Sequence, residues 1–263
     1  MPEGGWPMAT RPSSRQARTR QREQHILETA RTLVSVEGFL ALKMSDVAQA
    51  ASVSVGTLYT HFESKEDLIM ALATQTWRGR LAGFNAIFAV NTLSWAERLV
   101  AAVFVDFLFS VDHPELFAAE QLAATPSVWE GASERRTQEM RTLHHRIMDG
   151  IAQTAHQAIE SGEFEPWADR EQQARAVDRG IWTLMLGSSA VWSAVSTLEE
   201  EVAADTVEIP ETLQDLCQAL FCGYGWRSPD ASDDVRRLAA YCLQHGRFEP
   251  LPSASSNPAE QAP

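Results

Sequence analysis

Residues 46–68 read DVAQAASVSVGTLYTHFESKEDL, and this stretch decides the fold of the N-terminal part of the chain. Apolar residues at helical spacing predict one short helix over 44–51 and another over 55–62, with a three-residue polar break between them. Ser54 is placed to cap the second of these helices. A longer helix over about 19–37 stands in front of the pair, and the three together have the proportions of a helix-turn-helix.

The helix over 55–62 presents side chains that suit a groove of DNA. Its outward residues are short or amphipathic, and they are Val55, Gly56, Thr57, Tyr59, Thr60 and His61. The free N-terminus of this helix would offer backbone N–H groups and a positive dipole end to a phosphate. The alternative interpretation is an ordinary three-helix core, in which the polar break has no binding role.

The run VS-x-GTLY-x-HF-x-SKE-x-L, preceded by Gly38-Phe39 and Asp46-Val47-Ala48, resembles the N-terminal domain of the tetracycline-repressor (TetR) family of bacterial transcription regulators. The resemblance covers about residues 20–70. It implies a homodimer that binds a palindromic operator in double-stranded DNA, usually to repress transcription. It also implies release of the operator when a small ligand binds to the C-terminal domain, and for this chain we expect that effector to be lipophilic.

The resemblance further implies which residues meet DNA. Thr57 and Ser45 are expected to read base edges, whereas Tyr59, His61 and Lys65 are expected to hold phosphates. The full set of implied DNA contacts is Lys43, Ser45, Ser54, Val55, Gly56, Thr57, Tyr59, Thr60, His61 and Lys65.

Two positions depart from the pattern of the family. Lys43 stands where the family usually has a Ser or Thr that caps the second helix, and lysine cannot cap but can reach a phosphate. Ser52 stands where the family usually has Gly, so a left-handed backbone there would cost roughly 1 kcal/mol.

The rest of the chain predicts helices throughout, and the fold class is therefore all-α. Helices are expected over 94–111, 114–124, 127–161, 171–200, 210–224 and 233–244. We expect a disordered Arg-rich arm over 1–17, a helix-turn-helix domain over 18–66, a larger helical domain for ligand binding and dimerisation over 67–246, and a disordered tail over 247–263. The helix over 64–80 is expected to act as a lever, as the one connection between the two domains.

The helix over 171–200 carries an apolar seam that steps by three and four residues from Ala174. Together with the helix over 210–224 it predicts a four-helix bundle across a two-fold axis. The interface residues expected are Ile181, Leu184, Ser188, Val191, Val195, Leu213, Leu216 and Leu220. The alternative is that this helix is an ordinary core helix.

An effector pocket is expected between the helices of the larger domain. Its candidate residues are Phe104, Asp106, Phe107, Leu108, Trp129, Met140, His144, Met148, Trp182 and Met185, each of which could equally be core filler. Asp106 lies in an apolar run, so it must be paired, neutral or near water. It is either a partner of a neighbouring helix or a counter-charge for a cationic or polar ligand.

Charge is distributed unevenly along the chain. The net charge is −13 over 263 residues, with +2 over residues 1–80 and −15 over the remainder. Five arginines at positions 11, 15, 18, 20 and 22 stand without an acid among them. This asymmetry favours a polyanion as the partner of the first part of the chain alone, and the alternative is that the arginines belong to a solvated disordered tail.

Several classes of protein are excluded by the same sequence. Three cysteines do not form a disulfide framework or a zinc site, adjacent histidines at 144 and 145 cannot chelate together, and no motif predicts a cofactor, a metal or a catalytic centre. The longest apolar run is too short to span a membrane, and a cytoplasmic protein fits best. Two rival functions remain: a helix-turn-helix protein that a protein partner controls, or an all-helical enzyme with a vestigial DNA-binding domain.

Overall fold

The computed structural model describes residues 14–198 and 209–246. Within these ranges the regular structure is all helical, with one isolated antiparallel bridge between Phe164 and Trp226. The helices are α1 (Ser14–Ala41), α2 (Met44–Ala50), α3 (Val55–Tyr59), α4 (Lys65–Phe88), α5 (Trp95–Asp112), α6 (Pro114–Ala123), α7 (Pro126–Gly131), α8 (Glu134–Glu160), α9 (Arg170–Leu198), α10 (Glu211–Gly223) and α11 (Ala231–His245). The predicted all-α fold class is confirmed.

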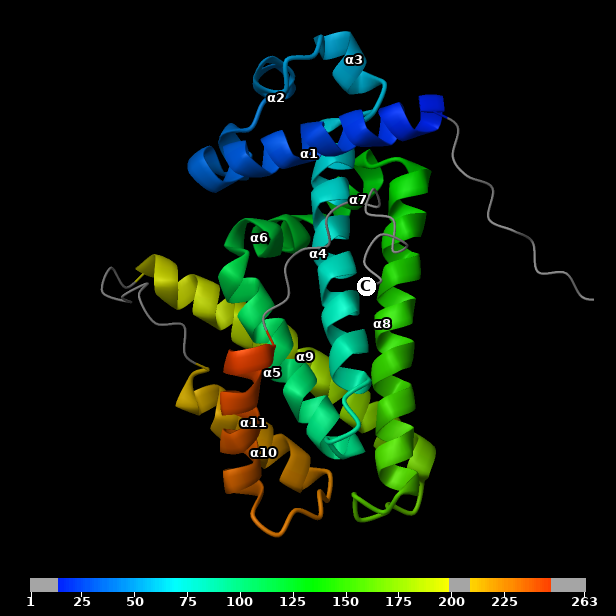
Figure 1. Ribbon diagram of the computed structural model, residues 1–263, viewed down its shortest axis with the longest axis vertical. Coiled ribbons are helices and arrows are strands. Elements are labelled where there is room, and N and C mark those ends of the chain that lie inside the picture. Colours follow the sequence, from blue (N-terminus) through cyan, green and yellow to red (C-terminus); the bar gives the residue numbers. More distant parts are fainter. Residues whose placement is uncertain (1–13, 199–208, 247–263) are drawn as a thin grey trace, which may run out of the picture.

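The helices form two bodies of unequal size (Figure 1). The α1–α3 unit lies across one end of the molecule, and α4 runs from it into the larger body, which comprises α4–α11. There α4 packs along α8, while α5 lies inside the body and is buried at every position from Leu99 to Ser110. No helix within the described ranges is both long and apolar enough to cross a membrane.

The N-terminal helix starts earlier than the sequence predicts. Residues 14–17 belong to α1, which corrects the expected disordered arm over 1–17 where the two overlap. At Gly38, the residue directly after the helix expected over about 19–37, the backbone has φ 75° and ψ 166° and interrupts the helix. Residues 1–13 and the tail over 247–263 lie outside the described residues.

The single helix expected over 127–161 is wrong, because the structure has α7 and α8 with a break between them. Ala132 and Ser133 are extended, each with ψ 151°. The backbone N–H and the hydroxyl of Ser133 both donate to Asp67 Oδ1, at 2.9 and 2.6 Å. These bonds to α4, 66 residues away in the chain, stabilise a break that no proline or glycine pair announces.

The expectation that α4 alone joins the two bodies is also wrong. From α1, Arg31 Nε donates to Glu115 Oε1 of α6 at 2.7 Å. Also on α1, Glu23 Oε1 accepts a hydrogen bond of 2.6 Å from Arg136 Nη2 of α8. The α1–α3 unit is therefore held by α6 and α8 as well as by the chain itself.

Candidate nucleic-acid interface and effector site

The short helix α3 is anchored on one side and open on the other. Leu58 and the following Phe62 are fully buried, and α3 packs against α2. Ser54 caps its N-terminus as predicted, accepting from the Thr57 N–H at 3.0 Å. Ser54, Val55 and Gly56 are exposed, so the start of the helix is open to solvent, while the Thr57 N–H is used by the cap. An anion at this end would meet a favourable helix dipole.

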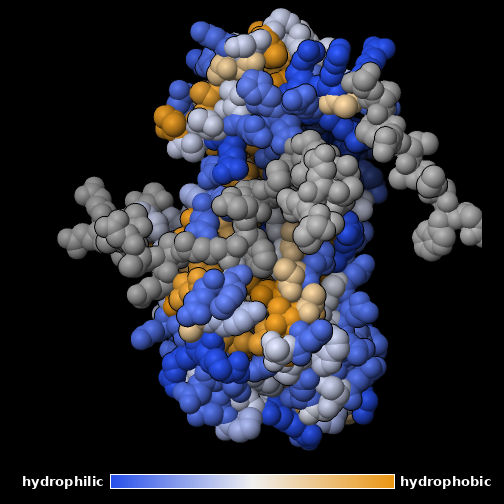
Figure 2. Space-filling model, in the orientation of Figure 1, coloured by the Kyte–Doolittle hydropathy of each residue, from blue (hydrophilic) through white to orange (hydrophobic). Residues whose placement is uncertain are grey.

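Most of the residues expected to contact DNA are accessible. Lys43, Ser45, Ser54, Val55, Gly56, Tyr59 and Thr60 are exposed, and Thr57 and Lys65 are partly so. Lys43 precedes α2 with an extended backbone and no side-chain cap, which agrees with its expected inability to cap. Figure 2 shows a mixture of hydrophilic and hydrophobic surface at the end formed by the α1–α3 unit.

The hydroxyls of this surface are partly engaged within the protein. Thr57 Oγ1 lies 2.8 Å from Ser54 Oγ, and Thr60 Oγ1 donates to the Thr57 carbonyl at 2.6 Å. Ser45 Oγ donates to Asp46 Oδ1 at 2.9 Å. A hydroxyl has two acceptor sites and one proton, so Thr57 keeps capacity for a base edge.

His61 does not face outward, and this corrects its expected place in the interface. Its side chain is only 7% exposed, and Nδ1 lies 3.8 Å from Glu23 Oε2 on α1. The chain turns at the end of α3 so that His61 packs against α1, and a one-residue step on a helical turn rotates a side chain by about 100°. The ring supports α1 instead of facing a phosphate.

Ser52, which stands where the family usually has Gly, adopts a left-handed backbone conformation. Its φ is +55°, and among described residues other than glycine it alone has a positive φ. The turn between α2 and α3 therefore keeps the geometry that glycine usually supplies, at the cost expected for a residue with a Cβ atom.

Two of the candidate effector residues, His144 and Trp182, lie together, whereas Asp106 belongs to a different cluster. On the α8–α9 side, the rings of His144 and Trp182 lie 5.8 Å apart, and Trp77 of α4 lies within 5.6 Å of both. Burial lowers the pKa of His144, with a smaller contribution from the neighbouring His145. Six of the ten candidates are buried: the charged Asp106 and five core side chains, Phe104, Phe107, Leu108, Met140 and Met185. The other four, Trp129, His144, Met148 and Trp182, are partly buried.

Asp106 belongs to a second group, which lies among α4, α5 and α6. Arg80 Nε lies 2.7 Å from Asp106 Oδ1, and Arg80 Nη1 also donates to Glu120 Oε1. Burial, with a smaller contribution from Glu120, raises the pKa of Asp106 to about 6, although the Arg80 charge opposes this. The salt-bridge alternative is therefore the correct one, and no observation here favours Asp106 as a counter-charge for a ligand.

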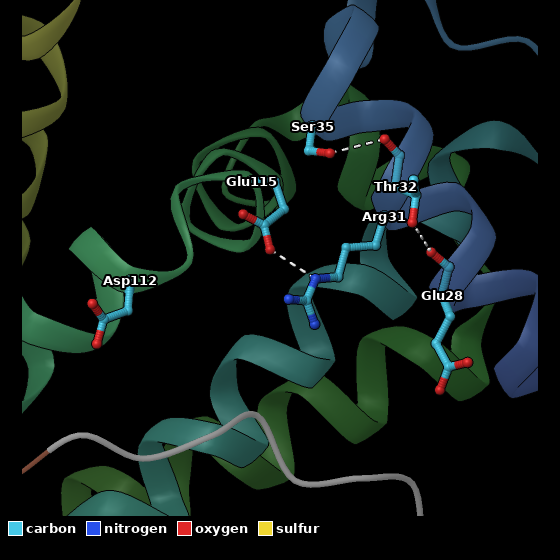
Figure 3. A pocket seen from close by; sticks show the side chains of 6 residues that line it. All are labelled: Glu28, Arg31, Thr32, Ser35, Asp112 and Glu115. Carbon is cyan, nitrogen blue, oxygen red and sulfur yellow. Dashed lines mark hydrogen bonds and ion pairs between the residues drawn. The ribbon is translucent and has the colours of Figure 1, made fainter. Parts of the chain in front are cut away.

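Neither of two pockets in the described part of the chain contains a candidate effector residue. One is a cleft of about 430 Å³ between α1 and the α5–α6 corner, lined by Glu28, Arg31, Thr32, Ser35, Asp112 and Glu115 (Figure 3). The other is lined by Pro229, Asp230, Asp233, Asp234, Arg236 and Arg237. The cleft in Figure 3 is polar and is crossed by the Arg31–Glu115 ion pair.

The surface expected to contact a second chain is only partly available. Ile181 and Leu213 are buried in their own subunit, so both are corrected from interface to core. Leu184, Ser188, Val195 and Leu220 are partly exposed, whereas Val191 and Leu216 are 63% and 50% exposed. Leu186 adds a further exposed apolar side chain on α9.

The reason for this division is the helical period. The buried line of α9 runs through Ala174, Val177, Ile181, Met185 and Ser189. A strict 3.5-residue seam drifts by about 20° per heptad on a straight helix. The predicted seam therefore starts in the core and ends on the outer face.

Sequence comparison identifies similar proteins for the N-terminal half. The family described as "Bacterial regulatory proteins, tetR family" matches residues 26–72, a range that contains α2 and α3. The HTH-type transcriptional regulator UidR of Escherichia coli K12 is 29% identical over 145 residues, which cover 54% of this chain and 68% of UidR.

Solved structures are similar over most of the chain. A regulatory protein of the tetR family from Rhodococcus RHA1 superposes with a TM-score of 0.56 at 15% identity, covering 79% of this chain and 99% of that one. Bacillus subtilis FadR, solved in complex with stearoyl-CoA, has a TM-score of 0.54 at 16% identity, covering 76% and 97%. At such identities the likeness establishes the fold, which here includes the larger body as well as the α1–α3 unit.

Proposed function

Because this chain belongs to the TetR family of bacterial regulatory proteins and is a transcriptional regulator, we propose that it acts as a cytoplasmic, homodimeric repressor. In this proposal two copies of α3 enter successive major grooves of a palindromic operator, and a small lipophilic effector releases them. The proposed DNA contacts are the predicted set without His61.

The observation that carries the proposal is the open first turn of α3. Ser54 fixes the start of the helix, Leu58 anchors its far side, and Val55, at 45% exposure, faces solvent. An apolar side chain held at the tip of a capped helix can contact a thymine methyl group, and the free N–H groups can meet a phosphate.

The apolar surface of α9 and α10 supports the dimer. Leu186, Val191 and Leu216 are exposed on two helices that pack against each other. A Cβ atom added at Gly187 would meet open space, so a second helix could approach closely there. Two α3 helices on one duplex need centres about 34–36 Å apart, which a symmetric dimer can fix.

For the signal that releases DNA there are two candidates, a small lipophilic effector and a protein partner. The complex of Bacillus subtilis FadR with stearoyl-CoA supports a lipophilic effector for a protein of this fold. The burial of six candidate residues supports the second candidate, a regulator that responds to a protein partner. Thermal unfolding with stearoyl-CoA, free fatty acids and lipophilic quaternary amines separates the two. Stabilisation by one class, together with release of DNA, supports the effector, and indifference to all supports the partner.

The experiment on DNA binding uses the full chain and a library of random duplexes at low ionic strength. We expect repeated selection to converge on a palindrome, and binding to weaken steeply as salt is raised, since phosphate contacts release counterions. The Val55→Glu variant should select no duplex, because a carboxylate at this tip would face phosphates. Failure of the unmodified chain to enrich any duplex would contradict the proposal.

A further inference from the structure

A buried arginine of the larger body reaches into the α1–α3 unit. Arg136, in the first turn of α8, is 3% exposed. Its Nη2 donates to Glu23 Oε1 of α1 at 2.6 Å, and its Nε lies 4.0 Å from Asp67 Oδ2 of α4. The guanidinium also lies over the ring of Phe62, 5.2 Å from the centroid. One side chain thus touches α1, the segment that follows α3, and the start of α4.

The surrounding backbone is tied to the same place. Asp67 Oδ2 accepts from the Glu63 N–H at 3.2 Å, and Asp67 Oδ1 accepts both bonds from Ser133. Ser64 Oγ donates to the Gly131 carbonyl at 2.7 Å. The segment between α3 and α4, together with the start of α4, is therefore attached by hydrogen bonds to the junction of α7 and α8, which immediately precedes Arg136.

Gly131 shows how closely these parts approach. A Cβ atom added at Gly131 would lie 2.7 Å from Cγ of Glu66, in the first turn of α4. Because interiors are close-packed, a displacement of α8 at this point must displace its neighbours or break these bonds. A displacement of α8 can therefore reach the end of α3 through these contacts, without any bending of α4.

We propose that Arg136 is a positioning residue for the recognition helix α3. The inference rests on the proposed DNA binding and adds a residue that contacts no DNA. Five residues of α3 cannot fix their own orientation, so the helix depends on its packing against α2 and on the buried Phe62 that follows it. Arg136 contacts both Phe62 and α1, the helix on which α2 packs. Its planar guanidinium donates to Glu23 while its charge stays within ion-pair distance of Asp67, and an ammonium group on a lysine cannot reproduce that geometry.

The test compares Arg136→Met with Arg135→Met in the full chain. Arg135 is a matched control, because it is the adjacent residue, its side chain is 61% exposed, and it lies 3.9 Å from the same Glu23 oxygen. Both variants lose one positive charge. Affinity is measured at one salt concentration for the duplex that the unmodified chain selects and for mixed-sequence DNA.

We expect Arg136→Met to lower affinity for the selected duplex about tenfold more than affinity for mixed-sequence DNA. Arg135→Met should leave this ratio within about twofold, and Arg136→Lys should not restore it. Glu23→Gln should lower the ratio as well, and the double variant should lose less than the sum of the two, because both changes break one contact.

Three results would overturn the inference. Arg136→Met could keep the ratio, it could lower both affinities equally together with the melting temperature, or it could prove additive with Glu23→Gln. If Arg136→Met does not fold, Glu23→Gln alone tests the proposal. An unchanged ratio of the affinity for the selected duplex to that for mixed-sequence DNA in Glu23→Gln would then contradict the positioning role. Failure of the unmodified chain to select a duplex would contradict the proposed function itself, which is a different result.

Discussion

The replacement Arg80→Met is predicted to destabilise the larger body severely. Arg80 is 3% exposed and forms ion pairs with two buried carboxylates. These belong to Asp106 and Glu120, which are 2% and 6% exposed. Methionine keeps most of the volume and removes the charge. Two buried carboxylates would then face each other without a partner, in an apolar setting provided by α4, α5 and α6.

The size of the effect follows from what burial costs each group. Removing one partner of a buried ion pair typically costs about 3–5 kcal/mol. The pKa of Asp106 is about 6 even with Arg80 present, and burial also raises the pKa of Glu120, so both carboxyls already resist ionisation. We therefore expect Arg80→Met to lower the free energy of unfolding by about 3–5 kcal/mol at pH 8. The loss should be smaller at pH 5.5, where the carboxyls can take up protons.

The assay is urea unfolding followed by circular dichroism, at equal protein concentrations because a dimer is expected. The triple variant Arg80→Met, Asp106→Asn, Glu120→Gln should recover most of the loss, since it removes the unpaired charges. A loss below about 1 kcal/mol for Arg80→Met at pH 8, or no recovery in the triple variant, would refute the reasoning.

In the unmodified chain, the cluster of Arg80, Asp106 and Glu120 should make the free energy of unfolding depend on pH. The folded pKa of Asp106, about 6, lies above the ordinary 3.8, so the folded protein binds this proton more tightly than the unfolded chain does. The contribution of Asp106 to the free energy of unfolding therefore falls as pH rises from about 4 to about 6. Comparison of the urea midpoints of the unmodified chain and Asp106→Asn across this range checks the sign. A steeper fall in Asp106→Asn would contradict it.

Three further changes test other parts of the structure. Ser52→Gly should raise the free energy of unfolding by roughly 1 kcal/mol in urea, because it relieves a positive φ, and Ser52→Ala should not. Tyr59→Phe should weaken binding to all duplexes alike in titrations, whereas Thr57→Ala should relax sequence preference; an unchanged preference in Thr57→Ala would remove Thr57 from base reading. Leu216→Glu should sediment as a folded monomer, since this side chain is 50% exposed in the isolated subunit, and a persistent dimer would contradict the α9–α10 interface.

Features that depend on neighbouring residues could be predicted from the sequence. Ser54 caps α3 as expected, and Ser64 caps α4 in the same way, because a serine three residues before an available N–H is a local arrangement. Gly38 interrupts α1 for a similar reason, since only glycine adopts its backbone readily. The run VS-x-GTLY-x-HF-x-SKE-x-L then resembled a known family, and this resemblance predicted the helix-turn-helix domain as a whole.

Features that depend on distant residues could not be predicted. Gly131 and Ser133 are residue types that mark helix ends, but the hydrogen bonds that hold the break before α8 come from Asp67, 66 positions away. Asp106 carries a signal, an acid in an apolar run, but its partner Arg80 and the second acid Glu120 lie on other helices. His61 was misplaced for the same reason, since Glu23 lies 38 positions before it.

Hydroxyl-radical footprinting of the selected duplex, bound by the full chain, tests the central claim most directly. The account predicts two protected regions on one face of the duplex, with centres one helical turn or about 34–36 Å apart, and two chains bound to each duplex. A single protected region with one chain bound, or protection that spreads evenly along the duplex, would contradict a symmetric pair of α3 helices in successive grooves.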